Sequence, residues 1–261
     1  MKKNILTLIL SFFISILIIE IGLRFFKIEY PIFQTHDFYR GFSLRPGASG
    51  WWLKEGSAYV EINNQGLRDQ NYKKYKSENI FRIALLGDSF AEARSIPLKK
   101  TFWHLMENNL NSCANIHKKI EVINFGVTEY STAQELLTLR HNAWNYNPDL
   151  IILAFFSGND IRDNSKILSN KKYRPFFIKK NNDIVLDNSF RKTKPYLILK
   201  SDLGKMAIKV SDYSRIAQLL KEIYVSIYLK KQILKQHKDL KVQKSQNNAN
   251  IDISKRKVIN I

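Results

Sequence analysis

The stretch Ile80-Phe81-Arg82-Ile83-Ala84-Leu85-Leu86, followed at once by Gly87-Asp88-Ser89-Phe90, decides the fold of this chain. The first seven residues are apolar except for Arg82, which is typical of a strand buried in a sheet. A serine on the turn after such a strand holds its hydroxyl at the carboxyl edge of the sheet, where open α/β sheets bind ligands. The sequence therefore predicts a nucleophile at Ser89, although Gly-Asp-Ser on its own is also an ordinary turn.

Downstream of this strand, apolar runs alternate with segments of helical periodicity. The pattern predicts helices over residues 97–111 and 132–145 and strands over residues 120–125 and 149–156. A β-α-β-α-β order implies right-handed crossovers and a parallel sheet with helices on its faces. The expected fold class is therefore α/β.

Two further strand ends carry residues suited to the same chemistry. Asn124-Phe125-Gly126 closes the second predicted strand, and Ser157-Gly158-Asn159-Asp160 closes the third. In a parallel sheet these ends share one edge with Ser89, so the three blocks can converge. A glycine lets its backbone N–H approach a developing oxyanion closely, and an asparagine amide supplies a second donor. Taken singly, each block is also explained as a turn or a helix cap.

Together the blocks resemble the first three signature blocks of the SGNH (GDSL-type) hydrolases, over roughly residues 60 to 235. Residues 63–69 also resemble the segment that precedes the catalytic block in membrane-anchored bacterial members. The resemblance implies a flavodoxin-like three-layer α/β/α sandwich with a parallel sheet. It implies Ser89 as the nucleophile and an oxyanion hole formed by the N–H groups of Ser89 and Gly126 and the side chain of Asn159. The supporting residues would be Gly87, Asp88, Asn124, Gly158 and Asp160.

The fourth signature of the family, Asp-x-x-His, is missing. No aspartate in the chain has a histidine three residues later, so the general base is not found. The histidines are His36, His104, His117, His141 and His237, and none follows a late strand end. The sheet also has fewer strands than the family's. Both absences predict an α/β domain that is incomplete at its carboxyl end. A lesser departure is Glu129, where related sequences often have a glycine.

The amino terminus predicts a membrane anchor. Met1-Lys2-Lys3-Asn4 precedes an apolar segment, and residues 5–26 as a helix would span about 33 Å at about 1.5 Å per residue. A bilayer's hydrocarbon core is about 30 Å thick. A cleavable signal peptide is the alternative, but no small-x-small site follows the apolar run. The positive-inside rule then places Lys2 and Lys3 in the cytoplasm and the main domain outside it, in a single-pass topology.

Composition excludes several other classes. The chain has 261 residues, of which 42 are Lys or Arg and 23 are Asp or Glu, for a net charge of +19. This excess is spread along the chain, and no helix-turn-helix, zinc-ligand cluster or aromatic RNA-binding signature accompanies it. We therefore expect no specific nucleic-acid partner, no cofactor and no metal. The single cysteine, Cys113, excludes an internal disulfide framework.

These patterns divide the chain into four expected regions. They are a membrane anchor over 1–27, a strand and loop region over 28–79, a partial α/β domain over 80–235 and a polar basic tail over 236–261. Within the third region we expect a hairpin over 173–190 and an amphipathic helix over 212–235, with Asp212 as its cap.

Three functions fit this organisation. The first is a membrane-anchored serine esterase facing outside the cytoplasm, with an acylated envelope glycan or lipid as substrate. The second is an O-acyltransferase of a cell-envelope polysaccharide, because a sugar hydroxyl can replace water in resolving an acyl-serine. The third is an inactive membrane-tethered binding protein or truncated gene product. The sequence leaves the acyl group, the acceptor and the oligomeric state open.

Overall fold

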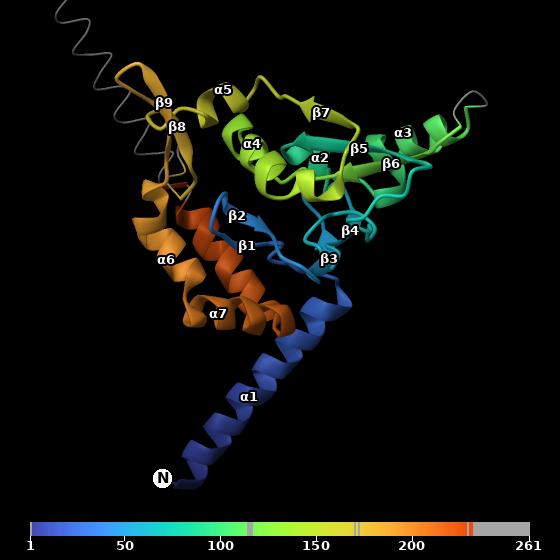
Figure 1. Ribbon diagram of the computed structural model, residues 1–261. Helices are drawn as coiled ribbons and strands as arrows, with labels where there is room; N and C mark the ends of the chain where they lie inside the picture. The colour runs from blue at the N-terminus through green and yellow to red at the C-terminus, as the bar shows by residue number, and fades with distance from the viewer. Residues whose placement is uncertain (1, 114–116, 170, 172, 229, 232–261) are drawn as a thin grey trace, which may run out of the picture. The chain divides into compact units, whose positions relative to one another are not determined.

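The structure, a computed structural model, describes residues 2–113, 117–169, 171, 173–228, 230 and 231 (Figure 1). The chain divides into two compact units, of which the first ends at Arg215 and the second begins at Ile216. In the second unit the described residues are helical. The strands that the structure describes, and the sites considered below, belong to the first unit.

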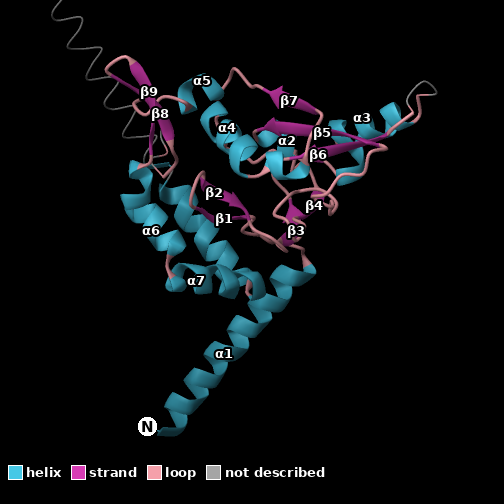
Figure 2. Cartoon of the chain, in the orientation of Figure 1, coloured by secondary structure: helices cyan, strands magenta, loops and turns pink. Residues whose placement is uncertain are grey.

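The centre of the first unit is a three-stranded parallel sheet. Its strands are β5 (Ile80–Gly87), β6 (Lys119–Asn124) and β7 (Leu150–Ala154), in the order β6-β5-β7 (Figure 2). In the register of the sheet, Leu85 lies opposite Asn124 on one side and Ile152 on the other. The predictions of an α/β fold and of a parallel sheet are therefore confirmed.

Successive side chains of β5 point to opposite faces of the sheet, so both faces carry apolar side chains. A helix packs on each face. Ile83 and Leu85 pack with Trp103 of α3 (Phe102–Asn111), whereas Ala84 and Leu86 pack with Tyr146 beyond α4 (Thr132–His141). Both predicted helices are shorter than expected. The turns η1 (Leu98–Lys100) and η2 (Ala143–Tyr146) are 3₁₀ helices, separated from α3 and α4 by the non-helical residues Thr101 and Asn142.

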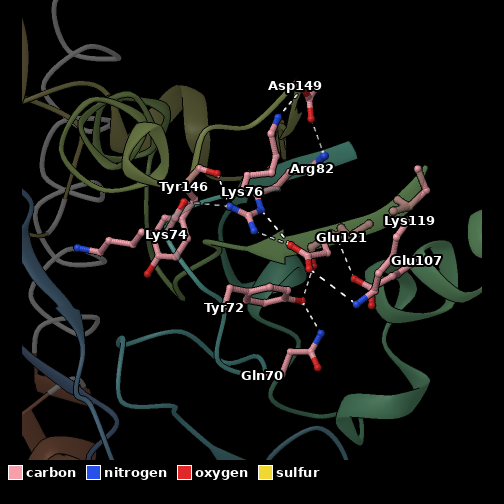
Figure 3. Close-up of polar contacts among 12 residues, drawn as sticks. Gln70, Tyr72, Lys74, Lys76, Arg82, Glu107, Lys119, Glu121, Tyr146 and Asp149 are labelled. Carbon is pink, nitrogen blue, oxygen red and sulfur yellow. Dashed lines mark hydrogen bonds and ion pairs between the residues drawn. The ribbon is translucent and has the colours of Figure 1, made fainter. Parts of the chain in front are cut away.

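At the amino ends of the strands, a polar network accounts for the arginine within the apolar run (Figure 3). Arg82 is 1% exposed, and its guanidinium donates to the Glu121 carboxylate at 2.6 Å and to the carbonyl of Tyr146. The carboxylate of Asp149 accepts from the Arg82 backbone N–H at 2.7 Å and pairs with Lys76 at 2.6 Å. A buried charge needs such partners, and here they tie the starts of all three strands together.

Residues 28–79 form two small antiparallel hairpins, in agreement with the expected short strands and loops. The first pairs β1 (Gln34–Asp37) with β2 (Gly41–Leu44), and the second pairs β3 (Ser49–Trp52) with β4 (Ala58–Glu61). Their apolar side chains share a core with Val127 and Tyr130, from the loop after β6. The Tyr130 hydroxyl also donates to the Phe42 carbonyl at 2.7 Å. The hairpins therefore support the loop that carries Gly126.

One helix in the described part of the chain is long and apolar enough to cross a membrane. It is α1 (Lys2–Phe25), in which Asn4–Phe25 has a mean hydropathy of 2.6 and none of the apolar window is buried. The predicted apolar helix at the amino terminus is therefore confirmed by its length and composition.

The segment after β7 holds α5 (Asp160–Asp163), the hairpin of β8 (Phe176–Lys180) and β9 (Asp183–Asp187), the 3₁₀ turn η3 (Ser189–Lys192), and helices α6 (Lys194–Lys200) and α7 (Asp202–Tyr213). The hairpin confirms the prediction over 173–190. The helix predicted over 212–235 is confirmed in the described residues 215–228, 230 and 231, which are helical. Its predicted start at Asp212 is wrong, because Asp212 lies in the last turn of α7 and the chain leaves that helix at Ser214. Its carboxylate pairs with Arg45 at 2.7 Å instead of capping a helix. Residues 232–261, which include the predicted tail and His237, lie outside the described residues.

Among the described residues β7 has a strand partner only on its β5 side. The side chains of Leu150 and Leu153 on this strand are exposed. An apolar cavity of about 470 Å³ lies beside it, with Leu86, Ile151, Leu153 and Phe177 in its lining. The described sheet thus has the three strands that the sequence pattern predicts.

Candidate functional site

Ser89 stands at the carboxyl edge of the sheet as the first residue of α2 (Ser89–Glu92). Asp88 caps this four-residue helix, since its carboxylate accepts from the Phe90 N–H at 2.9 Å. Gly87 is required by space, because a Cβ there would lie 2.7 Å from the Cβ of Ala91. Ser89 is exposed, and its Oγ makes no hydrogen bond to any residue that the structure describes. The hydroxyl is therefore accessible and uncommitted.

Asn159 is joined to this turn across the sheet edge. Its Nδ2 donates to Oδ2 of Asp88 at 3.0 Å, so the ends of β5 and β7 meet. Asp88 is fully buried, and a carboxylate only accepts, which fixes the amide nitrogen toward it. The second Nδ2 hydrogen remains available, and Asn159 Oδ1 is buried without a partner among the described residues. Two of the three predicted blocks, those of Ser89 and Asn159, are thus brought together.

Gly126 also lies against α2, but its N–H is occupied. It donates to Oδ1 of Asn124 at 2.9 Å, while Nδ2 of Asn124 donates to the Ala91 carbonyl at 2.9 Å. A Cβ at position 126 would lie 2.5 Å from the Cβ of Ala91, so the glycine allows the loop to pack on the helix. The role of Gly126 as an oxyanion donor stays a prediction, and it requires Asn124 to release this N–H.

Glu129 is a second backbone donor in the same loop. Its φ of 74° is in the left-handed region, which a residue with a side chain rarely adopts. Its N–H has no hydrogen-bond partner in the described part of the chain, and its carboxylate pairs with Lys171. Glycine adopts a left-handed φ at no steric cost, whereas a residue with a Cβ such as Glu129 does not.

Arg68 holds the far end of α2. It is 1% exposed, and its guanidinium donates to the carbonyls of Glu92, Ala93 and Ile96. These carbonyls lie at or just beyond the carboxyl end of α2, where backbone carbonyls have no intrahelical N–H donor. Burial lowers the pKa of Arg68 to about 10, so the side chain remains charged at neutral pH.

Asp69 and Glu92 hold the loop after β6. Asp69 accepts from the Asn124 N–H at 2.9 Å, and Glu92 accepts from the Thr128 N–H at 2.5 Å. Burial raises the pKa of Asp69 to about 7. Sequence reasoning identified the segment 63–69 only by resemblance and assigned no role to its Arg-Asp pair. In the structure, Arg68 binds the end of α2, the helix that begins at Ser89, and Asp69 and Glu92 bind the segment that carries Gly126.

A buried carboxyl group, Glu135, lies near Asp88 and Asp160 beneath the site. Glu135 is in the first turn of α4 and 1% exposed, and neither carboxyl oxygen has a partner among the described residues. Burial, with the charges of Asp160 and Asp88, raises the pKa of Glu135 to about 8. Burial also raises the pKa of Asp160, whose Oδ2 accepts from the Phe156 N–H at 2.8 Å. The Glu135 carboxyl therefore holds its proton to a higher pH than an exposed glutamate does.

Glu135 makes the stability of the protein depend on pH. A folded-state pKa above the unfolded value of about 4.5 means that the folded protein binds the proton more tightly. The free energy of unfolding should therefore fall as the pH rises from about 4.5 to about 8. Glu135→Gln removes this contribution, so the variant should gain stability relative to wild type between pH 5 and pH 9. Urea unfolding of the full chain in detergent at both values (about 5 and about 9) measures the effect.

The matched control for this experiment is Glu78→Gln, since Glu78 is exposed. It should follow the wild-type profile at every pH. Parallel profiles of Glu135→Gln and wild type would show that Glu135 does not titrate abnormally.

No described histidine is placed to act as a general base for Ser89. His141 stacks on the Tyr39 ring with a centroid distance of 3.8 Å, and His36 lies on β1. None of the four described histidines forms a hydrogen bond with Ser89, and His237 is outside the described residues. Within these same residues, no group of three His, Cys, Asp or Glu side chains is placed to hold a metal ion.

Two phenylalanines border the serine. Phe90 follows Ser89 and is 61% exposed, and its ring centroid lies 4.5 Å from that of Phe156 at the end of β7. Gly158 belongs to the same turn, where a Cβ would lie 2.6 Å from the Phe156 ring. The edge of the sheet therefore combines an exposed hydroxyl, a fixed amide and an apolar surface.

Comparison with protein-family models finds no match, and comparison with curated proteins finds no significant one. The interpretation of this site therefore rests on its own residues and their geometry.

Proposed function

We propose that the first unit processes acyl esters, with Ser89 as the nucleophile, in the manner of a membrane-anchored SGNH-type esterase. The observation that carries the proposal is the hydrogen bond between Asn159 and Asp88, because it fixes an amide donor at the edge where the Ser89 hydroxyl is exposed. The sheet with α3 on one face and α4 on the other supports a three-layer sandwich. Hydrolases of this kind need no metal or cofactor for the acyl-transfer step.

The proposed reaction follows from these groups. Ser89 Oγ adds to the ester carbonyl carbon, and the oxyanion that forms accepts a hydrogen bond from the free Nδ2 hydrogen of Asn159. Collapse of the tetrahedral species breaks the ester C–O bond, releases the alcohol and leaves an acyl-Ser89, which water then hydrolyses. The proton that Ser89 loses passes through water, or an added base such as imidazole, to the oxygen of the leaving alcohol, because no described residue contacts Oγ to accept it.

The proposed substrate is an acylated lipid or envelope glycan outside the cytoplasm. The exposed Phe90 and Phe156 rings offer apolar surface to an acyl group beside Ser89. The apolar α1 helix would keep the unit at a membrane, with Lys2 and Lys3 on the cytoplasmic side.

Covalent labelling with a fluorophosphonate tests the proposal. Serine Oγ attacks phosphorus and fluoride leaves, so the adduct reports nucleophilicity without requiring turnover. Because Ser89 lacks a contacting base in the described residues, labelling of the wild-type chain should be slow at pH 7 and faster with added imidazole. Ser89→Ala should not be labelled, whereas Ser157→Ala, which changes another strand-end serine, should behave as wild type. Labelling unaffected by Ser89→Ala would exclude Ser89 as the nucleophile.

A further inference from the structure

Helix α7 presents an apolar stripe to solvent. Gly204, Ile208 and Ser211 form its buried face. The exposed positions on the other side include Leu203, Met206, Val210 and Tyr213, which are 54 to 73% exposed. Their spacing places them on one side of a helix. A soluble surface helix normally directs its apolar residues inward, so an apolar stripe that faces outward indicates a further apolar environment.

The carboxyl end of α7 is fastened to the end of α1. Arg24, in the last turn of α1, donates to the Tyr213 carbonyl at 2.5 Å. Glu20 accepts from the Arg215 N–H at 2.9 Å and from the Ser214 hydroxyl at 3.3 Å. Figure 1 shows α7 beside the end of α1 that leads into the rest of the unit. The stripe therefore starts where the apolar helix would leave the hydrocarbon core.

Cationic side chains border the stripe. Lys205 and Lys209 are exposed on α7, and with Arg45 they line a cavity of about 280 Å³ that Tyr213 also borders. Arg45 is paired with Asp212 at 2.7 Å and Lys205 with Asp202 at 3.0 Å. Lys209 has no ion-pair partner among the described residues, so its charge is available.

We propose that α7 lies on the surface of the bilayer that α1 crosses, with its apolar stripe among the lipids and Lys205 and Lys209 at anionic headgroups. Interfacial helices combine such a stripe with flanking lysines, and they bury the apolar face about 5–10 Å below the headgroup level. Tyr213 takes the interfacial position that tyrosines favour. This contact would add a second attachment to the membrane and fix the orientation of the first unit, whatever reaction Ser89 performs.

The test uses the full chain in phospholipid vesicles, with Cys113→Ser as background and one new cysteine carrying an environment-sensitive fluorophore. Met206→Cys reports on the stripe. Leu17→Cys in α1 is the lipid-exposed reference, and Ile184→Cys on β9, an exposed apolar position, is the matched water-exposed control. Figure 1 shows β9 on the side of the unit away from α1. Brominated acyl chains should quench the labels at positions 17 and 206 and leave position 184 unchanged.

Lipid charge provides the second measurement. Quenching at position 206 should be stronger with phosphatidylglycerol than in phosphatidylcholine alone, and Lys205→Glu with Lys209→Glu should remove the difference. Each lysine near an anionic surface changes the ratio of bound to unbound helix about fivefold.

Quenching at position 17 without quenching at position 206 would overturn the proposal. A label at position 206 that is shielded from water yet insensitive to brominated lipid would also overturn it, in favour of a second protein copy. Absence of quenching at position 17 would show that α1 does not lie in the bilayer, and this would overturn the proposal. The Ser89 labelling results would not be affected.

Discussion

Asn159→Ala is expected to slow the imidazole-assisted labelling of Ser89 by about 10²- to 10³-fold, the usual loss when one oxyanion donor is removed. The Asn159 amide is oriented by the buried Asp88 carboxylate at 3.0 Å, and its second Nδ2 hydrogen is the donor that the truncation removes. The rate constant for fluorophosphonate incorporation, measured at fixed imidazole concentration, gives the effect directly. Ser89 should remain the residue that reacts, only more slowly.

The control for this variant is Asn145→Ala, since Asn145 is an exposed asparagine outside the sheet edge. It should label at the wild-type rate. A folded Asn159→Ala protein with an unchanged rate would show that the amide does not contact the developing oxyanion.

Arg68→Met is expected to lower the free energy of unfolding by about 2–4 kcal/mol, because the buried carbonyl of Glu92 and the part-buried carbonyls of Ala93 and Ile96 lose a charged donor. Methionine keeps most of the side-chain volume, so the loss comes from hydrogen bonding and not from a cavity. Urea unfolding of the full chain in detergent measures the change. Labelling of Ser89 should also slow in the folded variant, since Arg68 holds the end of α2.

Arg140→Met is the matched substitution, at an exposed arginine in the last turn of α4. Its effect should stay within about 0.5 kcal/mol, as is usual for exposed sites. Equal unfolding midpoints for the two variants would mean that the Arg68 hydrogen bonds add no net stability.

The sheet, and the meeting of the turn that carries Ser89 with Asn159, follow from the sequence pattern for a simple reason. Long apolar runs such as 80–86 and 149–156 form buried strands, and parallel strands end on one edge. The position of each strand-end residue is then a matter of topology and needs no knowledge of side-chain orientation.

Whether the Gly126 N–H is free to donate to a ligand could not be predicted from topology. Its N–H is taken by the side chain of Asn124 two residues earlier, and the rotamer of that asparagine depends on the Ala91 carbonyl of a different element. The role of Arg68 could not be predicted for a related reason. Its acceptors are backbone carbonyls, and no residue type in the sequence marks them.

Helices α6 and α7 were missed because their signals are local and weak. Pro195 stands in the first turn of α6, and Ser201 caps α7 by accepting from the Gly204 N–H at 3.0 Å. Glycine inside a helix lowers its intrinsic stability, and the apolar side of α7 faces solvent while its buried face holds Gly204 and Ser211, the reverse of the usual pattern. The helix predicted over 212–235 is a different one, which begins at Arg215 after the non-helical Ser214, so only its predicted start at Asp212, in the last turn of α7, is wrong.

Peptide mapping of the fluorophosphonate adduct tests the central claim most directly. Trypsin releases residues 83–94 as one peptide, in which Ser89 is the only hydroxyl-bearing side chain. The account predicts an adduct on this peptide in the wild-type chain, increased by imidazole and absent from Ser89→Ala. An adduct confined to other peptides, or labelling that imidazole leaves unchanged, would contradict Ser89 as a nucleophile that lacks only its base.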